Sequence, residues 1–327
     1  MKIVVGLHGG VREPDIRDLA AAGADEFFLG YVPGDWWEHV GFEVSPNRRY
    51  RPGNSFTDRG AMEAAVATAR SLGKSVSITF NEHHVTEWAF ERGLGIISHA
   101  MNAGVSAVIV ADPSVVGPVS AAFPSLAIHA SGDMGAGNRH AVDLLFSLGV
   151  SRVIFPREIA LDDIAAIRAQ TAGAGREFEA FVMGEPCVFD GSRCFTEHGY
   201  GFSCDFCNAH TVRLAAPRSG GHARPLEPRH GSLASDPSLS RIWSLGRCGL
   251  CAVPALRAAG VTHVKVPGRA SDALENTRLV AAMIKDPAST PESARALLAA
   301  PEVCKSGTFC YYKLDVKYNT TGNNKLK

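Results

Sequence analysis

The chain has 327 residues, of which 46% are hydrophobic and 20% are charged, so it has enough apolar content to bury a large core. Its 33 basic residues balance its 33 acidic residues, which excludes a global field directed at nucleic acid or an anionic membrane. The opening MKIVVGLHGG predicts no signal peptide, and no apolar stretch reaches the roughly 20 residues of a membrane-spanning helix. We therefore expect a cytoplasmic protein without membrane insertion.

Short runs rich in β-branched and aromatic residues alternate with helical stretches along most of the chain. In chain order, these runs predict strands at 2–8, 26–31, 74–81, 106–112, 126–131, 152–156, 177–184 and 262–267. Such alternation is typical of βα units on a parallel sheet.

The segments between the predicted strands carry helical periodicity. In 58–72 and 138–148, for example, apolar residues recur at three- and four-residue steps. The repeated helix–glycine–strand unit predicts an α/β fold, a closed (β/α)8 TIM-like barrel, with an open doubly wound sheet as the alternative. The glycines that would cap these helices in the left-handed conformation are Gly23, Gly73, Gly104, Gly149 and Gly260.

The regular rhythm stops between the seventh and eighth predicted strands. An insertion of this length is uncommon unless it is functional, and it would emerge at the C-terminal face, where barrel enzymes build their active sites. We therefore divide the chain into barrel strands one to seven (1–184), a Cys-rich metal-binding insertion (185–247), barrel closure (248–290) and a C-terminal extension (291–327). We expect the tail of the extension, from about Asp315, to be disordered or a cloning remnant.

All eight cysteines lie after residue 186. Cytosolic thiols at short spacings are more often metal ligands than disulfides, and thiolates suit both iron–sulfur clusters and zinc. Three interpretations stay open: a cluster, a zinc ion, or buried thiols without a ligand. A cluster would take Cys187, Cys194, Cys204 and Cys248, whereas zinc would pair the knuckles Cys204/Cys207 and Cys248/Cys251. Cys304 and Cys310 could close a second site with Cys207 and Cys251, but thiols without a ligand are the default interpretation.

Polar residues at the carboxyl ends of the predicted strands would ring the mouth of the barrel. Three cations of this set, Arg157, Lys265 and Arg269, could together bind a carboxylate-rich small molecule. Structural interpretations compete: Arg157 with Glu158 as an ion pair, and His129 as a satisfied core histidine. The candidate catalytic residues are Asn81, His129, Arg157, Glu158, Lys265 and Arg269, with Asp112 and Ser131 also at the mouth.

Four stretches resemble a known family. They are AAGADEFFLG, HASGDMGAGNRHAVDLLFSLGVSRVIFPREI, FVMGEPCVFDGSRCFTEHGYGFSC and CGLCAVPALRAAGVTHVKVPGR, and they are similar to segments of the collagenase-like peptidase family U-32. The resemblance implies a (β/α) barrel with a [4Fe–4S] cluster on four cysteines. It also implies an oxygen-independent hydroxylase, an iron–sulfur oxidoreductase acting on an aromatic, quinone-precursor or RNA-base substrate. Such an enzyme needs an electron donor or acceptor as a partner.

Carried over residue by residue, the resemblance places Cys187, Cys194 and Cys204 at the first three ligand positions. Cys248 fits the fourth, because its distance to the turn at Gly260 matches the family better than that of Cys251. The chain departs from the family in KVPGR, where members usually carry an acidic residue in place of proline. The alternatives to a hydroxylase are a collagenase-like peptidase, a zinc-binding structural protein and a non-catalytic partner subunit.

Overall fold

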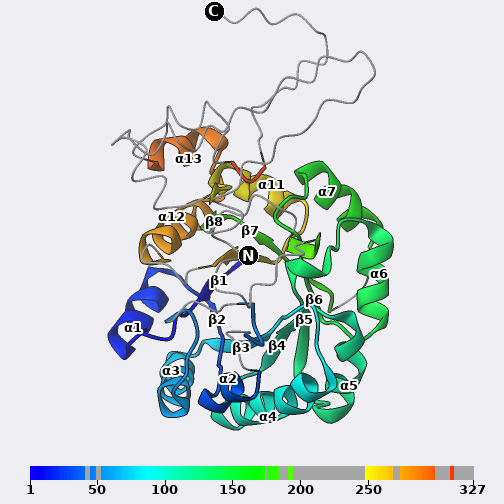
Figure 1. The fold of residues 1–327 in the computed structure, drawn as a ribbon. Coiled ribbons are helices and arrows are strands. Elements are labelled where there is room, and N and C mark those ends of the chain that lie inside the picture. The colour runs from blue at the N-terminus through cyan, green and yellow to red at the C-terminus, as the bar shows by residue number, and fades with distance from the viewer. Residues whose placement is uncertain are drawn as a thin grey trace, which may run out of the picture.

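The computed structural model describes residues 1–40, 45–48, 53–171, 173, 175–184, 191–193, 247–267, 273–298 and 310–312. Eight parallel strands close into a barrel in the order β1-β10-β7-β6-β5-β4-β3-β2, with helices around it (Figure 1). The strands are β1 (Lys2–Gly6), β2 (Glu26–Leu29), β3 (Ser75–Phe80), β4 (Ala107–Val110), β5 (Ala127–Ala130), β6 (Arg152–Ile154), β7 (Glu177–Phe181) and β10 (His263–Val266). The predicted (β/α)8 barrel is confirmed, and the open doubly wound alternative is wrong.

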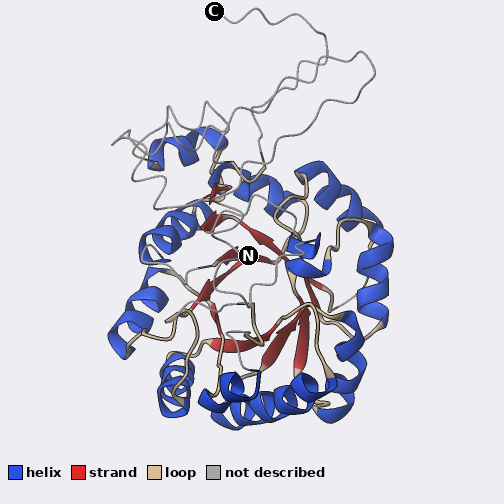
Figure 2. Ribbon diagram, in the orientation of Figure 1, coloured by secondary structure: helices blue, strands red, loops and turns tan. Residues whose placement is uncertain are grey.

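The helices lie outside the ring of strands (Figure 2). Asp58 and Asn138 cap two predicted helices, since their carboxylate and amide oxygens accept N–H bonds from Ala61 and Ala141 at 2.6 and 3.0 Å. The five glycines predicted to follow helices all have positive φ, between 71° and 120°. The helices that follow the eight strands in turn are α1 (Glu13–Ala22), α3 (Arg59–Ser71), α4 (Glu87–Ala103), α5 (Val116–Ala122), α6 (Arg139–Ser147), α7 (Leu161–Gln170), α11 (Val253–Ala258) and α12 (Ala273–Lys285), with α2 (Gly34–Val40) and α13 (Pro291–Leu297) in addition.

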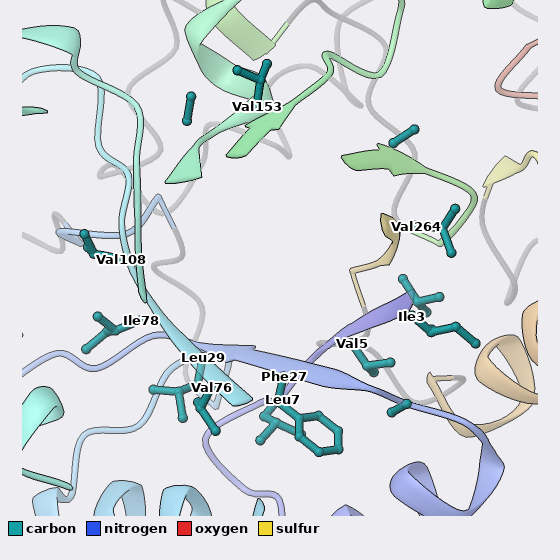
Figure 3. Close-up of a cluster of buried hydrophobic side chains, with 14 of the residues drawn as sticks. Ile3, Val5, Leu7, Phe27, Leu29, Val76, Ile78, Val108, Val153 and Val264 are labelled. Carbon is teal, nitrogen blue, oxygen red and sulfur yellow. The ribbon is translucent and has the colours of Figure 1, made fainter. Parts of the chain in front are cut away.

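The main apolar core lies between the strands and the helices. Alternate residues of each strand point outward into it, as Val5, Phe27, Ile78 and Val264 do in Figure 3. The other set of alternate residues fills the barrel itself. Because both faces of the strands are largely buried, the strands are mostly apolar, and polar or charged residues such as Ser77, Thr79 and Glu179 occupy inward positions.

The seventh predicted strand, 177–184, is wrong at its end. β7 stops at Phe181, and β8 (Met183–Gly184) pairs antiparallel with β9 (Arg247–Cys248) instead, with Met183 opposite Cys248. The physical reason lies at Val182, whose N–H still donates to the Lys265 carbonyl of the barrel while its own carbonyl accepts from Gly249 at 2.6 Å. The chain leaves the barrel there. β8 and β9 form a short two-stranded antiparallel sheet at the carboxyl end of β7, here called the β8–β9 hairpin.

Most of the Cys-rich insertion lies outside the described residues, as do Cys187, Cys194, Cys204, Cys207 and Cys304. In the described part of the chain, no helix is long and apolar enough to cross a membrane.

Candidate functional site

An ion network around Arg152 fills the barrel toward the amino ends of its strands. Arg152 is the first residue of β6, and its Nη1 lies 2.8 Å from Glu26 Oε2 and 3.1 Å from Glu179 Oε2. Its Nε donates to Glu177 Oε2 at 2.9 Å. Burial alone would raise the pKa of Glu179, but Lys265 and Arg152 lower it to about 2. The carboxylates are therefore ionised and are held by buried cations.

Lys265 belongs to this network rather than to the barrel mouth. Its Nζ donates to Glu179 Oε1 at 2.8 Å and lies 3.8 Å from the centroid of the Phe28 ring. Only 6% of Lys265 is exposed. The charge of this predicted mouth cation is thus compensated by Glu179 inside the barrel.

His129 also lies inside the barrel and is only 4% exposed. Burial, together with the positive charge of Arg152, lowers the pKa of His129 to about 3, so the ring is neutral near pH 7. Its Nδ1 finds no hydrogen-bond partner among the described residues. The position favours a core histidine over a residue that contacts a ligand at the mouth.

Replacing His129 with Gln should flatten the pH dependence of stability. In the unfolded chain a histidine binds its proton below about pH 6.5, whereas the folded protein leaves His129 neutral down to about pH 3. Stability contributed by the neutral ring is therefore lost as the pH falls through this window. Between pH 6 and pH 5 the free energy of unfolding should drop by about 1 kcal/mol more in the wild type than in His129→Gln, measured by urea unfolding at each pH. Equal slopes would show that His129 is protonated or exposed in the folded protein.

Four charged residues at the carboxyl ends of the strands form a second group, here called the mouth cluster: Arg48, Glu82, Asp133 and Arg157. Arg48 Nη1 lies 3.5 Å from Glu82 Oε1, and its Nε lies 3.7 Å from Asp133 Oδ2. Arg157 Nη1 lies 3.9 Å from Asp133 Oδ1, and the guanidinium stacks 4.1 Å from the centroid of the Phe181 ring. All four side chains are at most 17% exposed. Two cations and two anions are thus held at the mouth with little access to water.

The mouth cluster is assembled from residues that follow different strands. Glu82 comes two residues after β3, Asp133 lies in the turn η2 (Gly132–Met134) after β5, and Arg157 follows β6. Arg48 comes from the loop after α2 and has φ 54°, a left-handed conformation that costs a non-glycine residue roughly 1–2 kcal/mol. Of these four residues, only Arg157 was predicted from the sequence. A search two residues beyond each predicted strand end would have found Glu82 and Asp133.

Polar atoms beside the mouth cluster have unused hydrogen-bonding capacity. Asn81 Oδ1 and His83 Nε2 are buried and find no hydrogen-bond partner in the described part of the chain. Burial is the largest of the effects that lower the pKa of His83 to about 4, while burial raises the pKa of Glu82. Of the other predicted catalytic candidates, Glu158 is exposed and Arg269 lies outside the described residues.

The turn η3 (Gly191–Arg193), which directly precedes Cys194, packs on the mouth cluster. A Cβ at Gly191 would lie only 2.2 Å from Asp133 Oδ1, and a Cβ at Gly135 only 2.8 Å from Ser192 Oγ. The absence of both side chains lets η3 contact η2. The turn η3 is thereby anchored at the carboxyl face of the barrel.

Of the four cysteines predicted to hold a cluster, Cys248 alone lies among the described residues, and Cys251 of the zinc alternative lies nearby in η4 (Leu250–Ala252). Cys248 lies in β9 at the carboxyl end of the barrel, and its Sγ accepts the N–H of Leu250 at 3.5 Å. Such bonds stabilise a thiolate and tune the potential of a cluster. The described residues alone do not bring three possible ligands together. A four-thiolate centre at Cys248 therefore needs cysteines from outside them.

These features define a (β/α)8 barrel protein with a polar site and a thiol at its C-terminal face, the usual place of active sites in this fold. The chain belongs to Peptidase family U32, whose sequence model matches residues 14–289. This confirms the family resemblance found in the sequence.

Relatives with curated names are RNA-modifying proteins. The tRNA hydroxylation protein P of Escherichia coli (strain K12) is 30% identical over 182 residues, which cover 55% of this chain and 36% of that protein. The protein of the same name from Haemophilus influenzae is 30% identical over 55% of this chain and 35% of its own. The 23S rRNA 5-hydroxycytidine C2501 synthase of Escherichia coli (strain K12) is 27% identical over 56% of this chain and 24% of its own. The matched region thus spans about a third or less of each relative.

The solved structure of the U32 peptidase Mk0906 is 14% identical, covering 69% of this chain and 85% of that chain with a TM-score of 0.46. The family assignment rests on the sequence match alone.

Proposed function

We propose that this protein is an iron–sulfur enzyme that hydroxylates a base in RNA. The observation that carries the proposal is the match to U32 relatives named for tRNA hydroxylation and for 5-hydroxycytidine synthesis in 23S rRNA. The thiol of Cys248 and the buried mouth cluster at the same face of the barrel support it.

Cys187, Cys194, Cys204 and Cys248 would hold a [4Fe–4S] cluster, with zinc as the alternative metal. When bound, such a cluster supplies electron transfer, since four thiolates complete its coordination. The donor set fits, because thiolates are soft ligands and the Cys248 sulfur already accepts an N–H bond. An electron donor or acceptor is then required as a partner. The chain also needs RNA as a partner, or a related subunit that delivers the RNA.

The residues at the barrel mouth would orient the base. Asn81 Oδ1 can accept a hydrogen bond, and the neutral ring of His83 can donate or accept one at Nε2. Both atoms are buried and have no partner in the described part of the chain, so a planar base with donors and acceptors on its edge would satisfy them. The ion pairs of the mouth cluster hold the surrounding loops in place, because Arg48 joins the segments that follow β3 and β5.

The proposal predicts hydroxylation of RNA in cells. The chain would be expressed in an Escherichia coli strain that lacks its tRNA hydroxylation protein P, and total tRNA and rRNA would be digested to nucleosides. Mass spectrometry should then find a nucleoside heavier by one oxygen atom than its parent, absent from the empty-vector strain. An Asn81→Ala variant should reduce this product by about tenfold or more while leaving the fold and metal content unchanged, because it removes one hydrogen-bonding group from the base site.

The opposite outcome is no new nucleoside from a folded, metal-loaded protein. Cleavage of gelatin by that same preparation would then favour the collagenase-like peptidase. Zinc in place of iron would favour a structural protein, and activity only with an added subunit would favour a partner role.

A further inference from the structure

Residues 310–312, from the C-terminal extension, pack against the β8–β9 hairpin. Cys310 forms a parallel bridge with Cys248, and the Tyr311 N–H donates to the Cys248 carbonyl at 2.9 Å. Tyr311 Oη donates to the Gly184 carbonyl at 2.9 Å, and Tyr312 Oη donates to the Phe181 carbonyl at 2.7 Å. Hydrogen bonds from the backbone and from two side chains therefore hold this short segment in one register.

The hairpin is shaped to receive the segment. A Cβ at Gly249 would lie 2.9 Å from Tyr312 Cε2 and 3.4 Å from Tyr311 Cβ, so a side chain there would displace both tyrosines. Tyr311 is 5% exposed and extends the apolar cluster inside the barrel. The cluster consists of Val4, Phe28, Ile109, Ile154, Phe181 and Tyr311. Docking of residues 310–312 is thus part of how the barrel mouth is built.

This register places two cysteines side by side. Directly paired residues of neighbouring strands point their side chains to the same face, and the strands lie about 4.8 Å apart. A disulfide requires Cα atoms about 4.4–6.8 Å apart and Cβ atoms about 3.5–4.5 Å apart. The strand spacing of the bridge between Cys248 and Cys310 satisfies the first requirement, and a small approach of the two short strands would satisfy the second. Neither cysteine is part of a disulfide in the structure, and both residues are partly exposed.

We propose that Cys248 and Cys310 form a reversible disulfide that removes Cys248 from metal binding and fixes residues 310–312 over the barrel mouth. The oxidant is a small disulfide of the glutathione class. One thiolate of the pair attacks it, giving a mixed disulfide and releasing one glutathione thiol, and the second cysteine then attacks the mixed disulfide and releases the other. The two protein thiols lose two electrons and two protons, which the two glutathione thiols gain.

Only the effect of the disulfide on metal binding rests on the proposed function, because the disulfide itself needs no metal. When a cluster occupies Cys248, that sulfur is not available for exchange. Loss of the cluster would expose the thiol, and the disulfide would protect it from irreversible oxidation until it is reduced.

Peptide mapping tests the pairing directly. The full chain, stripped of metal under anaerobic conditions, would be incubated with oxidised glutathione, alkylated without reduction and digested with trypsin. Trypsin releases Cys310 as the sole cysteine of peptide 306–313, and releases Cys248 together with Cys251 in peptide 248–257. We expect these two peptides to be found linked, and to separate after treatment with dithiothreitol.

Two variants identify the sulfur that Cys310 joins. Cys251→Ser is the matched control, since it changes the other thiol of the same peptide, and it should keep the link. Cys248→Ser should abolish it. A link that survives in Cys248→Ser and disappears in Cys251→Ser, or the formation of mixed glutathione disulfides only, would overturn the proposal.

A metal-loaded sample separates this result from the proposed function. Wild-type protein carrying its cluster should form the linked peptide at least about tenfold more slowly than stripped protein, because only an uncoordinated thiolate exchanges. A chain that never holds iron would refute the proposed function yet still give the link. A cluster-bearing chain without the link, once stripped, would refute the disulfide alone.

Discussion

Replacing Arg152 with Met should lower the free energy of unfolding by about 3–5 kcal/mol, because it leaves carboxylates inside the barrel without their main cation. Glu179 is 1% exposed and Glu26 is 6% exposed, and both contact the Arg152 guanidinium at 3.1 Å or less. Methionine keeps the unbranched first part of the arginine side chain, so most of the loss would report the missing charge. Urea unfolding at pH 7 would measure it.

A surface ion pair provides the control for this variant. Arg59 lies 2.7 Å from Glu63 at the start of α3, and both side chains are at least 40% exposed, so Arg59→Met should cost no more than about 0.5 kcal/mol. Adding Glu179→Gln to Arg152→Met should restore part of the loss, because it removes one of the buried charges left uncompensated. A loss below about 1 kcal/mol for Arg152→Met would show that water reaches these carboxylates.

Replacing Cys248 with Ser should remove most of the iron and abolish RNA hydroxylation. A serine oxygen is a harder and less acidic donor than a thiol, so it binds iron of a cluster poorly. The fold should survive, because β9 is held by backbone bonds: the Cys248 carbonyl accepts from Tyr311, and Gly249 donates to Val182. Iron analysis, circular dichroism and nucleoside analysis of the same preparations would check the three parts of this prediction.

Cys251→Ser distinguishes the cluster from a zinc site. If Cys248 is the family ligand, Cys251→Ser keeps its iron and its hydroxylation product. If the two C-x2-C knuckles bind zinc together, both variants lose their metal equally. Retention of full iron by Cys248→Ser would contradict the ligand assignment made from the sequence.

The fold could be predicted from the sequence because local patterns and global architecture agree. The helical periodicity of 58–72 and 138–148 and the glycines after the helices were visible in the sequence, and the caps Asp58 and Asn138 begin those same two helices. The end of β7 was not predictable, since it depends on a hairpin between residues far apart in sequence. The Gly249 N–H donates to the Val182 carbonyl, and no local sequence pattern indicates that pairing.

The site was predicted less completely. Arg157 and Asn81 were predicted from their places at strand ends. Lys265 and His129 were predicted at the mouth in the same way, but both are buried, since the sequence does not show how deep a residue lies along a tilted strand. Arg48 was missed because its role depends on a left-handed loop conformation and on tertiary contacts with Glu82 and Asp133. The pairing of Cys310 with Cys248 was missed for the same reason, since 62 residues separate them in sequence.

Iron and sulfide content of the wild-type chain tests the central claim most directly. The protein would be purified without oxygen, and iron, acid-labile sulfide and zinc would be assayed together with the visible absorption spectrum. A brown protein with about four irons and four sulfides per chain is the expected result. A colourless protein with one zinc per chain and no sulfide would contradict the account of an iron–sulfur hydroxylase.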